Sequence, residues 1–342
     1  MLPEVEAWLR RRTSSSDDWP LPWLLEAKGD ATVSVVLPAR DEAGTVGDIV
    51  AAIRRDLMET VPLVDELVVV DSRSVDDTAA RAARAGARVV AQDEVLPDLK
   101  PLDGKGEALW KSLAATSGDL LVFVDADLRE FRTSFVTGLL GPLLADPDVV
   151  YVKGCYDRPL WDVQGGGGRV TELVARPLLN LHWPMLAGFV QPLAGEYAGR
   201  RSALERVPFV TGYGVELALL IDLLELAGLD ALAQVDLGRR VHSHQSTEAL
   251  GGMAAQILQT CWSRLERQNK MIPLHEPSPR LVQFRREAGS IGEAGSAGST
   301  EKAGGTGGSE RAVGHRAVVR DTAVAERPPM STVPDRRSHA PG

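Results

Sequence analysis

The segment Leu120-Leu121-Val122-Phe123-Val124-Asp125-Ala126-Asp127-Leu128 joins five consecutive apolar residues to a pair of carboxylates. An uninterrupted apolar run of this length predicts a strand that is buried on both faces, as in a parallel sheet. Because ionised carboxylates are costly inside a sheet core, we expect Asp125 and Asp127 where the strand emerges. Ligands bind at that carboxyl edge in open α/β sheets, and Asp-x-Asp suits a hard divalent cation that also holds phosphate oxygens. The alternative is an acidic turn after a core strand.

The residues before this segment alternate between predicted strands and helices. Strands are expected at 32–38, 66–70 and 87–90. A helix is expected after each of them: the first ends at about residue 59, the second begins near residue 78 and the third ends at about residue 115. This alternation predicts βαβ units and a mainly parallel sheet. Small or polar residues follow each strand at the same edge, as in a nucleotide-binding doubly wound domain. No G-x-G-x-x-G follows the first strand and no G-x-x-x-x-G-K-[ST] is present, which disfavours dinucleotide oxidoreductases and P-loop NTPases.

Three further patterns lie in the second half of the chain. Gly165 to Gly168 lead into a predicted helix with Arg169 at its start, which favours an anion, although a flexible glycine loop is the alternative. Glu216 is expected at the start of a strongly apolar helix, facing a cleft. Residues 235–244 read as a strand that places Arg240, His242 and His244 on one face.

Composition excludes several classes of protein. The net charge of −9 over 342 residues argues against a nucleic-acid-binding protein, because no basic excess is available to neutralise phosphates. Cys155 and Cys261 form no disulfide framework, so a reducing cytoplasm is expected. The most apolar long window, residues 173–194, contains Arg176, His182 and three prolines, and therefore does not predict a membrane span.

Several motifs together carry a resemblance to a known family. Residues 35–42, Val-Val-Leu-Pro-Ala-Arg-Asp-Glu, resemble the opening strand and loop of GT-A glycosyltransferases. Asp71-Ser72-x-Ser74-x-Asp76-Asp77-Thr78 and Asp125-x-Asp127 fit the same superfamily. Residues 104–110, 167–177 and 212–216 are more specifically similar to the actinobacterial glucosyl-3-phosphoglycerate synthases. The resemblance covers about residues 18–275.

The resemblance implies an α/β protein with the GT-A fold that moves glucose from UDP-glucose to the 2-hydroxyl of 3-phospho-D-glycerate, with retention at the anomeric carbon. It also implies Mg²⁺ or Mn²⁺ as cofactor and a homodimer. A related transferase with GDP-mannose as donor or a polyprenyl phosphate as acceptor is the alternative. A sugar nucleotidyltransferase would carry a G-x-G-T-R-like loop after the first strand, and residues 37–42 do not match it. A non-catalytic binding protein would tolerate loss of Asp-x-Asp and His242, which are all present.

The same resemblance assigns roles to single residues. Donor contacts are predicted for Pro38, Ala39, Arg40, Glu42, Ser72, Lys105, Asp125, Ala126, Tyr213 and Glu216. Acceptor contacts are predicted for Gly168, Arg169, Val170, Thr171 and His244. Asp127 and His242 are the predicted metal ligands, and these two residues with Lys105 and Arg240 form the predicted catalytic set. Arg40, Arg73 and His244 depart from the residues usual at their positions.

The predicted organisation has four parts. Residues 1–30 form a lead-in, residues 31–153 the nucleotide-sugar-binding half, and residues 154–275 the smaller half that binds the acceptor and completes the metal site. Residues 287–310 are rich in Gly, Ser, Ala and Glu and predict a flexible linker. We therefore expect a disordered tail over 287–342, within which 326–330 are able to dock as a short extended piece.

Overall fold

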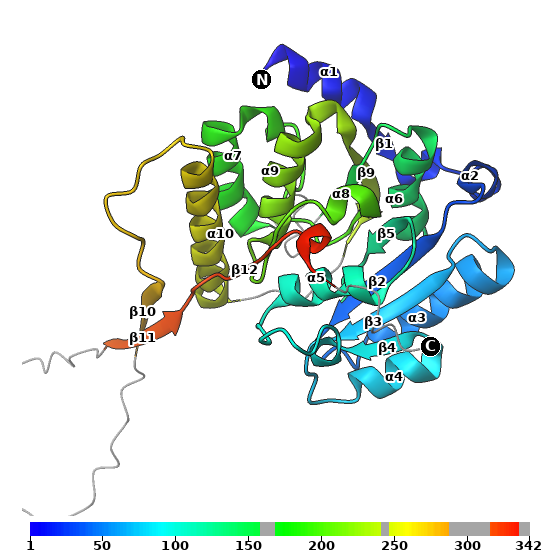
Figure 1. Ribbon diagram of the computed structural model, residues 1–342, viewed down its shortest axis with the longest axis horizontal. Helices are drawn as coiled ribbons and strands as arrows, with labels where there is room; N and C mark the ends of the chain where they lie inside the picture. Colours follow the sequence, from blue (N-terminus) through cyan, green and yellow to red (C-terminus); the bar gives the residue numbers. More distant parts are fainter. Residues whose placement is uncertain (158–167, 241–245, 287–314, 335–342) are drawn as a thin grey trace, which may run out of the picture.

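The computed structural model describes residues 1–157, 168–240, 246–286 and 315–334. Within them, eight strands form one sheet in the order β1-β9-β6-β7-β5-β2-β3-β4 (Figure 1). Their bounds are β1 Thr13–Ser15, β2 Val33–Ala39, β3 Glu66–Asp71, β4 Arg88–Ala91, β5 Leu120–Phe123, β6 Tyr151–Asp157, β7 Tyr197–Arg200 and β9 Leu232–Arg239. All neighbouring strands are parallel except β7, which is antiparallel to β5 and β6. The mainly parallel sheet expected from the sequence is therefore confirmed.

Helices cover both faces of this sheet (Figure 1). Their bounds are α1 Pro3–Arg12, α2 Leu21–Lys28, α3 Val46–Arg54, α4 Thr78–Ala85, α5 Lys105–Ala115, α6 Ser134–Ala145, α7 Arg176–His182, α8 Arg201–Leu204, α9 Val215–Ala227 and α10 Thr247–Arg267. Side chains of β5 alternate between two hydrophobic cores: Leu121 and Phe123 pack with α5 and α9, whereas Leu120 and Val122 pack with α3 and α6. Burial on both faces explains why this strand has an unbroken apolar sequence. None of the described helices has the length and apolar character that a membrane crossing requires.

Polar residues gather where the parallel strands end. Residues 40–42, 72 and 125–127 follow β2, β3 and β5, and Arg240 follows β9. Because β7 runs in the opposite direction, the residues that precede it, including Glu196, reach the same edge. The sheet thus brings side chains from distant parts of the chain to one side of the molecule.

The lead-in is an integral part of the sheet. Its strand β1 pairs in parallel with β9. The indole N–H of the fully buried Trp8 donates a 2.7 Å hydrogen bond to the carbonyl of Leu232, and the Trp8 ring packs 4.7 Å from that of Phe189. Residues before the first predicted strand therefore complete one edge of the sheet.

The expectation of a disordered tail is wrong for residues 315–334. Strand β10 (Arg280–Arg286) pairs in antiparallel fashion with β11 (His315–Asp321), forming an arm that projects from the body in Figure 1. Strand β12 (Glu326–Arg327) then pairs with β8 (Phe209–Val210), so the segment expected to be able to dock does so. The composition of 287–310 does not extend to these residues, and side chains such as Met330 are fully buried.

Candidate active site

A cavity of about 740 Å³ lies along the carboxyl edge of the sheet. The predicted site residues within the described ranges all line it: Pro38, Ala39, Arg40, Glu42, Ser72, Lys105, Asp125, Ala126, Asp127, Gly168, Arg169, Val170, Thr171, Tyr213, Glu216 and Arg240. The predicted residues His242 and His244 lie outside the described residues. The fold therefore joins motifs that are separated by up to about two hundred positions into one continuous surface.

Asp125 lies between two cations at the centre of this surface. Its Oδ1 is 2.5 Å from Lys105 Nζ and its Oδ2 is 3.0 Å from Arg240 Nη2. Burial alone would raise the pKa of Asp125, but the positive charges of Lys105 and Arg240 outweigh it and hold this pKa well below its ordinary value. Asp125 is thus an ionised carboxylate whose two oxygens are both engaged by the protein.

Lys105 is the first residue of α5, and it links this helix to α9. Its Nζ is 2.9 Å from Glu216 Oε1 as well as in contact with Asp125. Burial favours the neutral amine, yet the charges of Asp125 and Glu216 prevail and raise the pKa of Lys105 above its usual value. The lysine is therefore a fixed positive charge in the cavity wall.

Arg240 holds the other side of the carboxylate pair. One guanidinium nitrogen lies 3.0 Å from Asp125 and 3.1 Å from Asp127, while the other lies 3.3 Å from Glu196 and donates a 2.6 Å hydrogen bond to the Tyr156 hydroxyl. Arg240 is only 5% exposed, so these contacts are made in a desolvated setting. Sequence reasoning gave no role to Glu196, which the reversed direction of β7 brings to this edge, or to Tyr156 in β6.

The oxygen-rich part of the cavity suits a divalent cation. Burial, and then repulsion by the nearby Asp127 and Asp125, raise the pKa of Glu42 to about 7. The side chain of Asp127 is 46% exposed to the cavity, whereas that of Asp125 is 18% exposed. A hard carboxylate ligand at this place fits Mg²⁺ or Mn²⁺. The described residues contain no group of three or more His, Cys, Asp or Glu able to hold a metal, and His242 lies outside them.

The wall beside β2 and β3 contains residues that were predicted to contact the donor. Pro38, Ala39 and the exposed Arg40 belong to this wall, and Ser72 donates a 2.7 Å hydrogen bond to the side chain of Gln92. Arg73 does not line the cavity, since its guanidinium binds the carboxylates of Asp93 and Asp103. The unusual arginine at position 73 therefore ties the end of β3 to the loop before α5.

The opposite wall begins at Gly168 and continues into a helical segment. Arg169 donates a 3.2 Å hydrogen bond to the hydroxyl of Thr247, the first residue of α10. Two helix starts thus approach one another at the cavity, and free N–H groups at helix starts favour an anion. Gly104, Ala108 and Gly212, which belong to the motifs at 104–110 and 212–216, line the cavity as well. Further lining residues outside those motifs are Asp103, Leu193, Gly195, Thr211, Leu250, Met253, Gln256, Ile257, Asp321 and Ala323.

Known proteins with similar sequences and structures identify the family. The model described as "Glycosyl transferase family 2" matches residues 34–176. The glucosyl-3-phosphoglycerate synthase of Mycolicibacterium paratuberculosis is 49% identical over 266 residues, which is 76% of this chain and 80% of the relative. The corresponding enzyme of Mycolicibacterium smegmatis is 50% identical over 262 residues, covering 75% and 85% of the two chains.

Two solved structures extend this similarity to three dimensions. Glucosyl-3-phosphoglycerate synthase from Mycobacterium tuberculosis, in complex with Mn²⁺, UDP-glucose and phosphoglyceric acid, superposes with a TM-score of 0.74 at 41% identity, covering 92% of this chain and 95% of that chain. Mannosyl-3-phosphoglycerate synthase from Rubrobacter xylanophilus superposes with a TM-score of 0.84 at 38% identity, covering 96% and 99%. From its strands, its cavity and these relatives, the chain belongs to the glucosyl-3-phosphoglycerate synthase family and has the GT-A fold.

Proposed function

We propose that this protein transfers glucose from UDP-glucose to the 2-hydroxyl of 3-phosphoglycerate, with retention, and so forms glucosyl-3-phosphoglycerate. The observation that carries the proposal is that one cavity contains Asp125 and Asp127 together with predicted donor contacts, such as Pro38, Ala39 and Ser72, and predicted acceptor contacts, such as Gly168 and Arg169. The relatives from Mycobacterium tuberculosis were solved with UDP-glucose and phosphoglyceric acid, and with UDP and glucosyl-3-phosphoglycerate. The arrangement of the cavity suits the same substrates.

Charge stabilisation is the main task of the protein in this reaction. Negative charge develops on the diphosphate as the sugar leaves, and Lys105 and Arg240 offer fixed positive charges beside Asp125. A divalent ion held by Asp127 and the predicted ligand His242 would supply Lewis-acid stabilisation of the same leaving group. Solved relatives contain Mn²⁺ or Mg²⁺.

Retention is explained by attack from the side of the leaving group. The acceptor oxygen forms its bond to the anomeric carbon as the bond to the diphosphate breaks, and a departing phosphate oxygen takes the acceptor's proton. Glu216 is the one carboxylate in the matched motifs that could be nominated as a nucleophile, but it is 6% exposed and paired with Lys105. Mass spectrometry that found a glucosyl adduct on Glu216 would contradict this route.

Substitution of Arg169 tests whether this residue contacts the acceptor and not the donor. We expect Arg169→Ala to raise the KM for 3-phosphoglycerate by about tenfold, because a charge-assisted contact to an anion is lost. The KM for UDP-glucose should change far less. Arg176→Ala is a matched control on the same helical segment, since its guanidinium is held 2.8 Å from Glu172. Equal increases in both KM values for Arg169→Ala would argue against its assignment to the acceptor wall.

A donor-by-acceptor activity matrix tests the function as a whole. UDP- and GDP-activated glucose and mannose are combined with 3-phosphoglycerate or a polyprenyl phosphate, each with Mg²⁺, with Mn²⁺ or with EDTA. We expect turnover with UDP-glucose and 3-phosphoglycerate, and its loss in EDTA. Preferred turnover of GDP-mannose, or of the lipid acceptor, would replace the proposed substrates.

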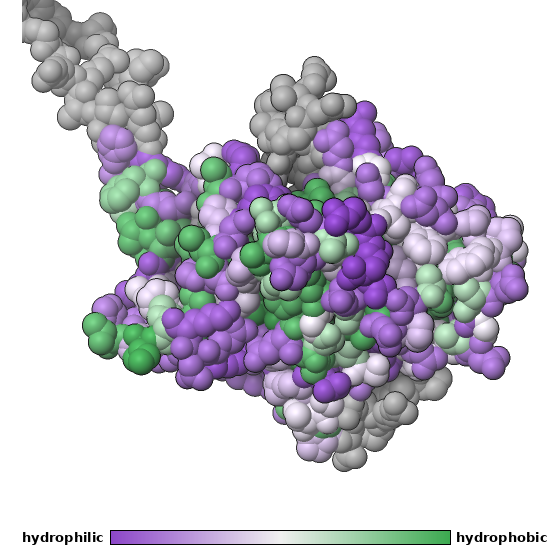
Figure 2. Space-filling model, turned by 90° about the horizontal axis from the view of Figure 1, so that it is seen from above, coloured by the Kyte–Doolittle hydropathy of each residue, from purple (hydrophilic) through white to green (hydrophobic). Residues whose placement is uncertain are grey.

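A homodimer in a reducing cytoplasm is part of the same proposal. The β10–β11 arm exposes large apolar side chains, with Phe284 69% and Val319 60% exposed, and Figure 2 shows apolar surface gathered on this arm. Exposed apolar patches of this kind mark protein interfaces. Cys155 and Cys261 are both free and buried, in keeping with a reducing compartment. Light scattering of the protein and of Phe284→Glu measures whether the arm joins two copies.

A further inference from the structure

The segment 321–330 borders the cavity, although no step of the proposed reaction uses it. Asp321 and Ala323 line the cavity beside the residues from the central sheet. The segment then runs from the β10–β11 arm across to α5 (Figure 1). Met330, near its end, is fully buried. The segment 321–330 thus contacts both the cavity and the hydrophobic core, although it belongs to none of the sequence motifs.

The first contact of this segment is with β8. Beyond the strand pairing of β12 with β8, the carbonyl of Ala325 accepts hydrogen bonds from the Thr211 amide at 2.9 Å and the Thr211 hydroxyl at 3.1 Å. Thr211 opens the loop that leads to Tyr213 and Glu216, which both line the cavity. The position of that loop therefore depends on the segment.

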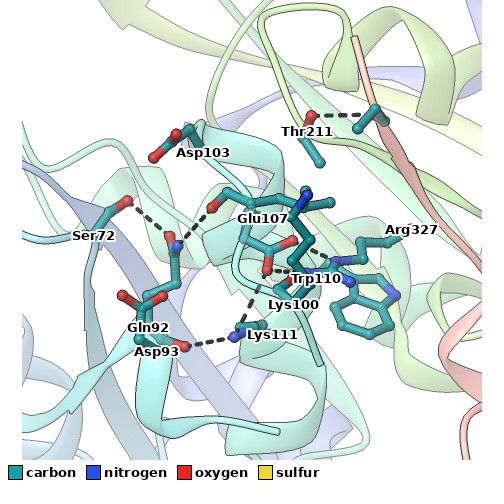
Figure 3. A network of polar contacts seen from close by, with 12 residues as sticks. Ser72, Gln92, Asp93, Lys100, Asp103, Glu107, Trp110, Lys111, Thr211 and Arg327 are labelled. Carbon is teal, nitrogen blue, oxygen red and sulfur yellow. Dashed lines mark hydrogen bonds and ion pairs between the residues drawn. The ribbon is translucent and has the colours of Figure 1, made fainter. Parts of the chain in front are cut away.

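The second contact is with α5, and Figure 3 shows it at close range. Arg327 donates to both carboxylate oxygens of Glu107, at 2.7 and 2.6 Å, and to the carbonyl of Lys100 at 2.6 Å. The indole of Trp110 donates a 2.8 Å hydrogen bond to the carbonyl of Pro328 and lies 5.1 Å from the Arg327 guanidinium. Glu107 is completely buried, and its carboxylate contacts two cations, Arg327 and Lys111, whose Nζ is 3.7 Å away.

The two elements held by the segment meet at the predicted donor site. The amide of Gly106 in α5 donates a 3.0 Å hydrogen bond to the carbonyl of Thr211, and Lys105 lies 2.9 Å from Glu216. The same network continues from Lys111, whose Nζ donates to the carbonyl of Gln92 at 3.0 Å, to Ser72 in the wall beside β2 and β3 (Figure 3). The contacts of this one segment with β8 and α5 therefore affect the positions of Lys105, Glu216 and Ser72.

We propose that the segment 321–330 sets the geometry of the donor-diphosphate site, and that Arg327 is a positioning residue that acts through Glu107. The assignment of that site to a nucleoside diphosphate sugar rests on the proposed function. A guanidinium fork fixes a carboxylate in both distance and orientation, which a lysine ammonium does not do. A displacement of a fraction of an ångström of the charged groups at this site slows the reaction. The developing charge on the diphosphate is stabilised only by groups that are already in position.

The substitution Arg327→Lys tests the proposal in the full-length chain. It keeps the positive charge opposite Glu107 but loses the fork. We expect the KM for UDP-glucose and the dissociation constant for UDP to rise by about tenfold, while the KM for 3-phosphoglycerate changes by less than about twofold. Trp110→Phe, which removes the hydrogen bond to Pro328 and keeps an aromatic ring, should raise the donor KM in the same direction by about threefold.

Hydrogen exchange provides the readout that does not need turnover. Amides of residues 104–108 and 211–216 should exchange faster in Arg327→Lys than in the unmodified protein, without any substrate. Arg55→Lys is the matched control, because Arg55 makes a comparable fork to Asp56 at 2.7 and 3.0 Å on the exposed segment after α3. This control should leave both the exchange and the KM values unchanged.

The outcomes of the two experiments are separable. If the unmodified protein does not turn over UDP-glucose, the proposed function fails, and the exchange data then decide on the positioning role alone. Unchanged exchange at 104–108 and 211–216 in Arg327→Lys overturns the proposal in either case. Faster exchange with equal effects on donor and acceptor KM also overturns it, because the role would then be purely structural.

Discussion

Asp125 and Asp127 lie two residues apart and have different surroundings. Both carboxyl oxygens of Asp125 are engaged, one by Lys105 and the other by Arg240, whereas the Asp127 side chain is 46% exposed and meets Arg240 through one oxygen. Residues i and i+2 share a face only while the strand continues, and β5 ends at Phe123. Their surroundings favour a supporting role for Asp125 and a metal-binding role for Asp127.

Asp127→Asn separates these two roles. We expect kcat/KM to fall by about 10²–10³-fold, because the neutral amide is a poor ligand for a hard cation and leaving-group stabilisation is lost. Calorimetry should show weaker Mn²⁺ binding, with little change in the melting temperature. Asp125→Asn, by contrast, should lower the melting temperature, because the buried Arg240 and the partly buried Lys105 lose a charged partner. A metal affinity unaffected by Asp127→Asn would remove this residue from the ligand set.

Lys153 is a buried lysine in β6, close beneath the site. It is 1% exposed, its Nζ contacts the Tyr151 hydroxyl at 3.4 Å, and it lies 4.8 Å from the centre of the Tyr197 ring. Burial, opposed by the negative charge of Glu216, lowers the pKa of Lys153 from 10.5 to about 7. A lysine in this setting gives up its proton in the folded protein far more readily than in the unfolded chain.

The pH dependence of stability follows from this difference. Between about pH 7 and 10.5 the unfolded chain holds a proton on Lys153 that the folded protein lacks, so the free energy of unfolding rises with pH. The rise is at most about 1.4 kcal/mol per pH unit. Below about pH 7 both the folded and the unfolded protein carry the proton on Lys153. The full free-energy cost of burying the charged side chain then remains. Lys153→Met should therefore be more stable than the unmodified protein near neutral pH, with an advantage that shrinks as pH rises. Urea denaturation from about pH 7 to 8.5 measures this difference, and a constant gap between the two proteins would disprove it.

Helix α5 requires glycine at the point where it approaches β8. Gly104 has a φ of +110°, and a Cβ on Gly106 would lie 1.8 Å from the carbonyl oxygen of Val210. That oxygen belongs to the backbone of a paired strand and cannot move aside easily. The glycines of the motif Gly104-Lys105-Gly106 therefore allow α5 to pack closely against β8, and this packing brings Lys105 to the cavity.

Gly106→Ala tests this element. We expect it to lower the free energy of unfolding by about 1–3 kcal/mol through overpacking and to raise the KM for UDP-glucose. Gly47→Ala in α3 is the control, since its Cβ would meet nothing closer than 3.9 Å. That change should stabilise the protein by about 0.5–1 kcal/mol, as alanine is the better helix former. Equal stability of Gly106→Ala and the unmodified protein would show that α5 can move away from β8.

The molecule as a whole is built around one sheet with a hydrophobic core on each face. Helix α1 and strand β1 close the edge of this sheet at β9, and β9 leads directly to Arg240. The amino-terminal residues therefore support the strand that delivers a site residue. Because the buried Trp8 ties α1 to β9 and β1 pairs with the same strand, we expect these two elements to unfold together with the sheet.

Trp8→Ala tests this coupling. We expect a loss of about 3–5 kcal/mol in the free energy of unfolding, because a fully buried indole and its hydrogen bond to Leu232 are removed. The transition should stay single and cooperative. Trp23→Ala, at a side chain that is 38% exposed, should cost much less. A separate low-temperature transition in Trp8→Ala, with the main transition unchanged, would show that the lead-in folds apart from the sheet.

Local patterns were sufficient to predict the central strands β2, β3 and β5 and the polar edge of the sheet. The runs at 32–38, 66–70 and 120–124 correspond to β2, β3 and β5, because burial on both faces leaves an unbroken apolar signature. The placement of Asp125 and Asp127 beyond β5 also follows from a local fact, the cost of ionised groups in a sheet core. The sequence therefore contained the central strands, their carboxyl edge and the carboxylates of the site.

Pairings between distant residues required the tertiary structure. Arg240 and Asp125 are 115 residues apart, and Arg327 and Glu107 are 220 residues apart. Neither pair leaves a periodic signal, since which buried charge meets which depends on strand order, register and the reversed β7. Residues 315–334 contain few large apolar side chains, so composition indicated a loose tail. Their order comes from a strand partner and a buried ion pair that exist only once the rest of the chain has folded.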